Sequence, residues 1–319
     1  MRKLVPIALL LCLVAPPAGG APPALPRTAI FYYPWFSAPP RDLSYTHWSQ
    51  AGHDPPQDIA SNYYPARGAY SSASPTILRD QMQDIADAGV AEVVSSWWGI
   101  DSRENVRLWS VVRAAKAFGL RVAVHIEPYD DRTVASVGED IAYLHSLGID
   151  DFYVYRAADQ PAAEWAQLNA TLTGVRVFAQ TSLPGFAAAG RFTGLYTYDV
   201  LSYGGASFGR ICAEAHRLRL LCAPSVGPGY MATAATGDPR VKPRLGGATY
   251  DSMWRAAIAA GADIVTITSY NEWNEGTQIE PAAVHRDYQS YDGAYGLEGR
   301  AAEDAYLVRT AYWSERLRR

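Results

Sequence analysis

The chain alternates between strand-like and helix-like segments about eight times, and this alternation constrains its fold more than any other feature. Short runs rich in Val, Ile, Tyr and Phe, without strict polar alternation, predict strands that are covered on both faces. The predicted strands are 29–35, 90–97, 121–126, 152–155, 176–181, 194–198, 219–224 and 263–268. Strands that alternate with helices are typical of a parallel sheet.

Helical patterns separate the predicted strands. The clearest patterns are 75–88, 104–118, 133–147, 206–217, 249–260 and 301–317. Gly89, Gly119, Gly148 and Gly261 follow four of them, where a C-cap glycine belongs. Eight strand–helix units favour a single α/β domain, a (β/α)8 TIM barrel, over an open doubly wound sheet. No GxGxxG motif follows the first strand, which removes the usual dinucleotide-binding alternative.

Two segments, 36–74 and 225–248, are long for barrel loops. Each follows a predicted strand, so we expect extended loops on the C-terminal face, where barrel loops build the active site. The 319 residues are 49% hydrophobic and 19% charged, which leaves room for a large core. No repeat, low-complexity tract or linker divides the chain, and we expect one domain over 21–319.

The N-terminus has the pattern of a secretion signal. Arg2 and Lys3 precede an apolar stretch, 4–14, that is too short to span a bilayer, and small residues at 18–21 offer a cleavage site. We therefore expect residues 1–20 to be removed, and the mature protein to be secreted or periplasmic without a membrane anchor. The formal net charge of −4 and the lack of a basic run exclude nucleic acid and anionic membranes as partners.

Two cysteines, Cys212 and Cys222, remain after such processing. An oxidising compartment permits a disulfide between them. The first lies on a predicted helix and the second on the following strand, so two buried thiols fit the sequence equally well. Both alternatives stay open at this point.

The last predicted strand leads into an unusual polar and aromatic cluster. After the β-branched run 264–268 the chain continues Ser-Tyr-Asn-Glu-Trp-Asn-Glu over 269–275. Two carboxylates three residues apart, with a Trp between them, are costly to place against a core without a purpose. A surface loop with glutamates facing water is the alternative, but the dense Asn, Trp, Gly and Gln nearby disfavour it. At the end of a barrel strand the cluster indicates an active site.

Aromatic and acidic residues also gather at the ends of other predicted strands. They occur in FYYPW (31–35), SSWWG (95–99), HIEPY (125–129), YTYD (196–199) and PSVGPGY (224–230). Aromatic rings stack on sugar rings and carboxyl groups transfer protons. Two carboxyl groups that flank a glycosidic bond, one with a raised pKa, would catalyse its hydrolysis. Desolvation beside Trp273 would raise such a pKa.

Other chemistries fit the sequence less well. The six histidines, at 47, 53, 125, 145, 216 and 285, show no HxH or HExxH spacing, so we expect no metal site. No GxSxG elbow, reactive cysteine motif or phosphate loop is present, and we expect no cofactor. His125 alone fits a satisfied core residue as well as a site residue. We expect a monomer.

Several motifs together resemble glycoside hydrolase family 99, the endo-α-1,2-mannosidases and endo-α-1,2-mannanases. The matching segments are FYYPW (31–35), YTHW (45–48), YYPARGAYSSASP (63–75), SSWWG (95–99), HIEPY (125–129), FYVY (152–155), GLYTYD (194–199), PSVGPGY (224–230) and ITSYNEWNEGTQIEP (267–281). The resemblance covers essentially the whole mature chain. It implies a (β/α)8 barrel and a retaining enzyme that cleaves within a mannose-containing chain.

The resemblance also implies a mechanism without an enzyme nucleophile. Glu272, the first Glu of the NEWxEG motif, would deprotonate the substrate's own 2-hydroxyl, whose oxygen attacks the anomeric carbon and gives a 1,2-anhydro sugar. Glu275 would protonate the leaving sugar and later activate water. A hydroxyl already held on the ring has a high effective concentration, which favours this route.

Further residues are expected to bind the substrate by the same resemblance. Glu127, Tyr33 and Tyr230 would line the −1 sugar pocket. Trp98 stands where bacterial mannan-degrading members carry Trp and animal members carry Tyr, which favours mannose over glucose at the −2 subsite. The other expected substrate-binding residues are His125, Tyr198, Asn271, Trp273 and Arg244.

The chain departs from the family pattern in three places, one of which is a short region between the third and fourth predicted strands. The animal enzymes continue after GPGY with an Arg-Pro-Trp-Asn run, whereas this chain has Met-Ala-Thr-Ala-Ala-Thr-Gly-Asp over 231–238, and Arg156 replaces a common Asp. The leading interpretation is an exported endo-α-mannosidase or mannanase that acts on α-mannan or mannose-containing glycans. The alternatives are a hydrolase of another α-linked polysaccharide and a non-catalytic glycan-binding barrel. Retention of Glu127, Glu272 and Glu275 argues against the last.

Overall fold

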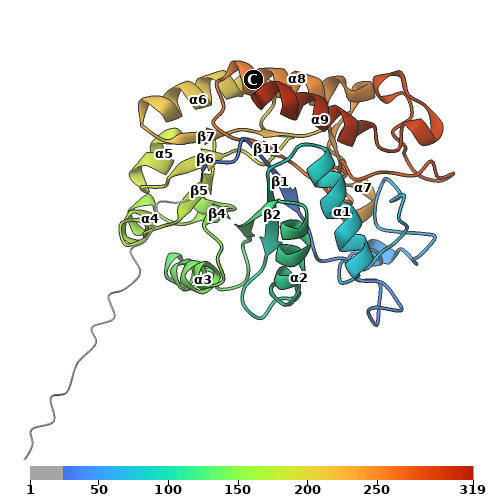
Figure 1. Cartoon of the computed structure of the whole chain (residues 1–319), viewed down its shortest axis with the longest axis horizontal. Helices are drawn as coiled ribbons and strands as arrows, with labels where there is room; N and C mark the ends of the chain where they lie inside the picture. Colours follow the sequence, from blue (N-terminus) through green and yellow to red (C-terminus); the bar gives the residue numbers. More distant parts are fainter. Residues whose placement is uncertain (1–23, 319) are drawn as a thin grey trace, which may run out of the picture.

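The computed structural model describes residues 24–318, and these form a barrel of parallel strands surrounded by helices (Figure 1). The strands are β1 (Thr28–Tyr32), β2 (Glu92–Trp97), β3 (Arg121–Ile126), β4 (Asp151–Val154), β5 (Arg176–Gln180), β6 (Gly194–Tyr196), β7 (Leu221–Ala223), β8 (Ser225–Val226) and β11 (Val265–Ile267). Each pairs in parallel with its neighbour in the order β7-β6-β5-β4-β3-β2-β1-β11-β8. The predicted (β/α)8 architecture is confirmed.

The barrel closes through one interrupted strand. β7 pairs with β6, and β8 pairs with β11, while only Pro224 separates β7 from β8. Proline has no N–H to donate to a ladder, although its carbonyl still accepts from Thr266 N at 3.2 Å. β7 and β8 therefore act together as the seventh of the eight barrel strands.

Within residues 24–318, eight helices form the outer layer, one after each barrel strand (Figure 1). They are α1 (Pro75–Asp87), α2 (Arg103–Ala117), α3 (Val134–Ser146), α4 (Ala162–Asn169), α5 (Pro184–Ala189), α6 (Phe208–Arg217), α8 (Ala248–Ala259) and α9 (Ala305–Arg318). The side chains of Ser74 and Ser102 cap the N-termini of α1 and α2. The helices α4 and α5 are short, and the sequence pattern did not mark them clearly.

Strand burial explains the continuous apolar runs in the sequence. In β1, Ile30 and Tyr32 pack outward against the helix layer, whereas Ala29 and Phe31 point into the barrel. The interior is filled with aromatic rings, such as Tyr153 stacked on Phe178 with centroids 4.8 Å apart. The barrel is thus a packed core, and chemistry is confined to its rim.

Two predicted strands extended more than one residue beyond the observed strand end. The first was expected to reach residue 35, but Tyr33 N bonds to the side-chain oxygen of Asn271 at 2.7 Å instead of joining the ladder. The sixth was expected to reach residue 198, but Tyr198 has a left-handed φ of 54°, which ends extended structure. Both corrections fall where side chains turn toward the C-terminal rim.

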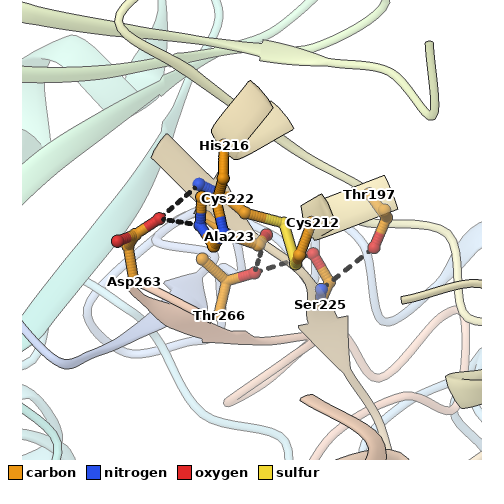
Figure 2. Close-up of a disulfide and its surroundings, with 8 residues drawn as sticks. All are labelled: Thr197, Cys212, His216, Cys222, Ala223, Ser225, Asp263 and Thr266. Atoms are coloured by element: carbon orange, nitrogen blue, oxygen red, sulfur yellow. Dashed lines mark hydrogen bonds and ion pairs between the residues drawn. A yellow bond between two sulfur atoms is a disulfide. The ribbon is translucent and has the colours of Figure 1, made fainter. Parts of the chain in front are cut away.

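Cys212 and Cys222 form a disulfide that joins α6 to β7 (Figure 2). Both residues are fully buried. One turn after Cys212, His216 Nε2 lies 2.9 Å from Asp263 Oδ2, and the same oxygen accepts from Cys222 N at 2.8 Å. The alternative of two free thiols is therefore wrong, and the disulfide belongs to a small network that ties α6 to the start of the last strand.

Three long segments cover the C-terminal face: 33–74, 227–247 and 268–304. The first two were predicted, and the third was not recognised as a long loop. The second contains β9 (Tyr230–Met231), α7 (Thr233–Thr236) and β10 (Val241–Lys242), where β9 and β10 form an antiparallel hairpin. The first and third meet at isolated bridges, Tyr63 to Gln289 and Pro65 to Ala282.

The predicted signal, residues 1–20, lies outside the described residues and stays a prediction. Between residues 24 and 318, no helix has both the length and the apolar character needed to cross a membrane.

Candidate active site

Glu272 sits in a tight turn directly after β11. Its backbone N–H donates to Ser269 Oγ at 2.8 Å, and its Oε1 accepts from Asn274 N at 3.0 Å and from Glu275 N at 3.3 Å. The residue is only 2% exposed. The turn therefore fixes the Glu272 carboxyl group and places Glu275 on the same short stretch of backbone.

Both glutamates have raised pKa values. Burial raises the pKa of Glu272 well above its usual range, and the charge of Glu275 raises it further. Burial also raises the pKa of Glu275 to about 7, with contributions from the nearby carboxylates of Asp199, Glu127 and Asp238. Glu275 keeps part of its surface exposed. Two interacting carboxyl groups titrate as a pair, and at neutral pH such a pair retains a proton for acid catalysis.

Glu127 follows β3 and brings a third carboxyl group to the rim. Its Oε1 accepts from Ser96 Oγ at 2.8 Å and lies 2.9 Å from His125 Nδ1. On its other side, His125 Nε2 lies 2.8 Å from Tyr196 OH. Neither Glu127 nor His125 is more than 4% exposed, so their mutual contacts hold both side chains in place.

Tyr33 and Tyr198 join the three carboxyl groups. Their hydroxyl groups share a short hydrogen bond. Burial raises the pKa of Tyr33 well above its usual range, and Glu127, Glu272 and Glu275 each raise it further. The Tyr33 hydroxyl thus lies within electrostatic reach of all three glutamates and stays protonated as a hydrogen-bond donor. The structure brings together six predicted site residues: Tyr33, His125, Glu127, Tyr198, Glu272 and Glu275.

Asn271 and Trp273 lie beneath the site and not in it. Both are 0% exposed. Besides accepting from Tyr33 N, Asn271 donates to Tyr33 O at 3.0 Å, so it ties the last strand to the first. Trp273 Nε1 donates to Glu280 at 2.8 Å. Neither side chain has surface with which to contact a sugar, and both support the turn of Glu272 and Glu275 from below.

Arg244 also lies behind the turn that carries Glu272 and Glu275. Its guanidinium group is 4.7 Å from the ring centroids of Tyr63, Tyr291 and Tyr306, which surround it. Its Nη2 donates to Gly276 O at 3.0 Å and to Gln278 O at 2.7 Å. Arg244 therefore fixes the chain just after Glu275, and does not line the cavity that contains Glu275.

Trp98 does not line the cavity that contains Glu275 and lies instead on an open groove between the ends of β2 and β3. The residue is 36% exposed. The groove has a volume of about 640 Å³, and its wall includes Ile100, Pro128 and Tyr129. Since Pro128 directly follows Glu127, the groove borders the catalytic rim, which suits a neighbouring sugar subsite.

A cavity of about 130 Å³ opens beside Glu275. It is lined by Tyr155, Tyr198, Asp199, Val200, Leu201, Tyr230, Arg240, Thr268, Glu275 and Thr277. Tyr198 and Tyr230 were predicted, whereas Tyr155, Asp199 and Arg240 were not. Asp199 had a usable signal, because it ends the motif GLYTYD at a strand end. Arg240 had none, because it follows a stretch without a recognisable pattern.

Within the part of the chain that the structure describes, no group of three or more His, Cys, Asp or Glu side chains is arranged to hold an ion. The site supplies carboxyl groups, tyrosine and threonine hydroxyls, a histidine and an arginine. These groups suit proton transfer to and from a polyol.

Comparison with known proteins agrees with the fold and the motifs. The model of glycosyl hydrolase family 99 matches residues 26–319. A glycoprotein endo-alpha-1,2-mannosidase-like protein of Danio rerio is 34% identical over 355 aligned positions, covering 90% of this chain and 77% of the relative. The glycoprotein endo-alpha-1,2-mannosidase of Xenopus laevis is 30% identical, covering 90% and 76%.

Comparison with solved structures also indicates family 99. The GH99 endo-alpha-mannosidase from Bacteroides thetaiotaomicron is 30% identical and superposes with a TM-score of 0.81, over 92% of this chain and 97% of that one. With more distant glycosidases only the fold is shared: an exo-beta-1,4-mannosidase of Opitutaceae bacterium strain TAV5 has a TM-score of 0.51 at 10% identity, over 92% of this chain and 60% of that one. This chain therefore belongs to glycosyl hydrolase family 99 and is a glycoside hydrolase.

Proposed function

We propose that the protein is a retaining endo-α-1,2-mannosidase or mannanase that cleaves α-mannosidic bonds within mannan or mannose-containing glycans. The observation that carries the proposal is the pair Glu272 and Glu275 on one turn, with the Tyr33 hydroxyl in electrostatic reach of both. The relatives from Danio rerio and Xenopus laevis, an endo-alpha-1,2-mannosidase-like protein and an endo-alpha-1,2-mannosidase, support the linkage.

Glu272 serves as the base. Its carboxyl group is fixed by two backbone N–H groups, and these hydrogen bonds stabilise the ionised form that a base requires. It removes the proton from the substrate's 2-hydroxyl, and that oxygen attacks the anomeric carbon. The product of this step is a 1,2-anhydro sugar, and no bond to the enzyme forms.

Glu275 serves as the acid and then as the base. A pKa of about 7 leaves a substantial protonated fraction at neutral pH, so the group can protonate the departing glycosidic oxygen. The resulting carboxylate then accepts a proton from water, which opens the anhydro sugar. Two inversions at the anomeric carbon give net retention.

We also propose that the protein is exported, to the extracellular space or a periplasm. The disulfide between Cys212 and Cys222 supports this location, because structural disulfides form and persist in oxidising compartments. The charged and apolar pattern of residues 1–20 has the features of a signal.

The test is a product analysis. Purified protein is incubated with an α-1,2-branched mannan and with a glucosylated mannose oligosaccharide, and the products are resolved by size and by NMR of the anomeric proton. We expect disaccharide release with the α-configuration retained, and the preferred substrate identifies the −2 sugar. A first product of inverted configuration would contradict the mechanism. Binding without any product would favour a glycan-binding role. Cleavage of a different α-linked glycan would favour the alternative of a hydrolase that acts on another α-linked polysaccharide.

A further inference from the structure

We propose that the cavity beside Glu275 is the subsite for the departing sugar, and that Arg240 selects that sugar by hydrogen bonds to its hydroxyl groups. This inference rests on the proposed function, since it assigns the leaving-group side of the same reaction. The residues involved come from the hairpin of β9 and β10 and from the end of β6.

The position of the cavity relative to the three glutamates supports this assignment. Its lining includes Glu275 but not Glu272, Glu127 or Tyr33. Tyr230, which was expected in the −1 pocket, also lines this cavity and is therefore assigned to the side of Glu275. The acid in glycoside hydrolysis must face the oxygen of the departing group, whereas the base works on the sugar that is attacked. The space that only Glu275 reaches is therefore the side on which the leaving sugar lies.

The hairpin that forms one wall is anchored to the backbone of the acid. Met231 N donates to Glu275 O at 2.9 Å. Gly276 has a φ of +65°, and a Cβ there would lie 2.5 Å from Met231 O, so glycine permits this close approach. The wall that carries Tyr230 and Arg240 therefore keeps a fixed distance from the Glu275 carboxyl group.

Arg240 is held in place by Asp238 in the same hairpin. Arg240 Nη2 donates to Asp238 Oδ2 at 2.7 Å, and Tyr230 OH donates to that oxygen at 2.9 Å. Arg240 also donates through its backbone N and through Nε, each at 3.0 Å. Among the described residues none accepts from Nη1. One edge of the guanidinium group is thus oriented by Asp238, and Nη1 remains for a ligand in the cavity that Arg240 lines.

The charges around the cavity favour a neutral polyol over an anionic leaving group. Three carboxyl groups, of Asp199, Asp238 and Glu275, accompany the cations of Arg240 and Lys242. The charge of Arg240 is largely compensated by Asp238, to which it is bonded at several atoms. Vicinal sugar hydroxyls match an arginine donor beside carboxylate acceptors. At about 130 Å³ the cavity is small against the roughly 300–1,000 Å³ of drug-sized pockets, which suits a single sugar ring.

The experiment compares two substrates that differ only on the leaving side. One is an α-linked mannose oligosaccharide, whose leaving group is a sugar, and the other is the fluoride of the same non-reducing disaccharide, whose leaving group fills no sugar subsite. Arg240→Ala is assayed on both. The matched control is Arg217→Ala, because Arg217 is also an exposed arginine paired with a carboxylate, with 67% of its side chain accessible against 68% for Arg240.

We expect Arg240→Ala to lower kcat/KM on the oligosaccharide by about 10-fold or more, the effect of losing a hydrogen bond from a charged donor, and to change the fluoride rate less than about 2-fold. Arg217→Ala should change neither, and melting temperatures should show that both variants fold. An equal loss on both substrates would mean that Arg240 acts on a step that both substrates share, and an alkaline limb of kcat/KM that moves in Arg240→Ala would mean that Arg240 acts through the acidity of Glu275. An unchanged oligosaccharide rate would remove Arg240 from the subsite. Any of these results overturns this inference alone. A wild-type protein that hydrolyses neither substrate overturns the proposed function as well.

Discussion

Trp273 Nε1 donates a hydrogen bond to the buried carboxylate of Glu280 at 2.8 Å. Trp273 stands between Glu272 and Glu275 in the sequence, so this contact holds the turn that carries both. Glu280 is 0% exposed and also accepts from Tyr70 OH and Gln81 Nε2, each at 2.8 Å. A buried carboxylate with this many donors is a rigid anchor, because each unsatisfied partner would carry a large desolvation cost.

We expect Glu280→Gln to reduce both stability and kcat, with a smaller change in KM. The variant removes the charge that faces Arg67, whose Nη1 lies 3.3 Å from Glu280 Oε1. Arg67 keeps its pair with Asp84, so we expect a loss of about 1.5–3 kcal/mol, the contribution of hydrogen bonds to a charged group. The measurements are urea unfolding and steady-state kinetics on the oligosaccharide substrate.

The double variant Gln81→Glu with Glu280→Gln is the matched control for this anchor. The exchange keeps an amide–carboxylate pair between α1 and the catalytic loop, and the new amide oxygen can still accept from Trp273. Tyr32 OH, which donates to Gln81 Oε1 at 2.6 Å, can donate to the new carboxylate. We expect substantial recovery of kcat. A double variant as impaired as the single one would show that the carboxylate of Glu280 itself is needed.

The pH dependence of kcat/KM should show an alkaline limb near pH 7. The pKa of Glu275 is raised to about 7, and its deprotonated form cannot protonate the leaving oxygen, so the rate should fall as the pH rises through this value. Asp199 is the largest charged contributor after burial. Asp199→Asn removes that negative charge, lowers the pKa of Glu275 and should move the limb to lower pH. Glu139→Gln, on the exposed face of α3, should leave it in place. An unmoved limb in Asp199→Asn would exclude this coupling.

The fold and the centre of the site follow from local sequence patterns. Apolar runs and C-cap glycines mark strands and helix ends one segment at a time, and closure of a parallel barrel then forces all carboxyl ends of the strands onto one rim. Gly89 and Gly148, predicted as C-caps, have φ values of 71° and 88°. For this reason Glu127, Glu272 and Tyr33 meet, although no local pattern says how close they come.

The supporting contacts could not be predicted, because they join residues that are far apart in the chain. Glu280 and Gln81 are separated by 199 positions, and Asn271 and Tyr33 by 238. A tryptophan beside two glutamates is typical of a residue that stacks on a sugar ring. Trp273 is buried instead, because its Nε1 donates to the buried Glu280. The position of Arg240 beside the cavity could be found only from the three-dimensional course of the β9–β10 hairpin. This hairpin lies in the segment where the chain departs from the animal enzymes.

Removal of the disulfide should lower stability without changing the catalytic constants. The bridge closes a loop with a sequence separation of 10, for which the chain-entropy model gives about 2.7 kcal/mol. We expect a Cys212→Ala, Cys222→Ala variant to unfold at lower urea concentration, with kcat unchanged because the bridge lies between α6 and β7, away from the catalytic turn. Wild-type protein at the same concentration is the reference. Coincident unfolding curves would mean that the bridge contributes nothing to the folded state.

Replacement of each catalytic glutamate should separate the two chemical roles. Glu275→Gln should abolish turnover of an unactivated mannan oligosaccharide, by about 10²–10⁴-fold or more, while calorimetry shows binding largely intact. On a disaccharide fluoride the same variant should release a first equivalent of fluoride rapidly, because fluoride departs without an acid, and then stall, because water is no longer activated.

Glu272→Gln should lack that first burst, since no base remains to ionise the 2-hydroxyl that attacks the anomeric carbon. Its amide oxygen can still accept from Asn274 N and Glu275 N, so the turn should persist and the loss can be assigned to chemistry. Stopped-flow fluoride release measures both variants in one assay. Full hydrolysis of the oligosaccharide by Glu275→Gln would show that the acid is misassigned. A normal burst in Glu272→Gln would show that another group is the base, and the mechanism through the substrate's own hydroxyl would then need a different residue.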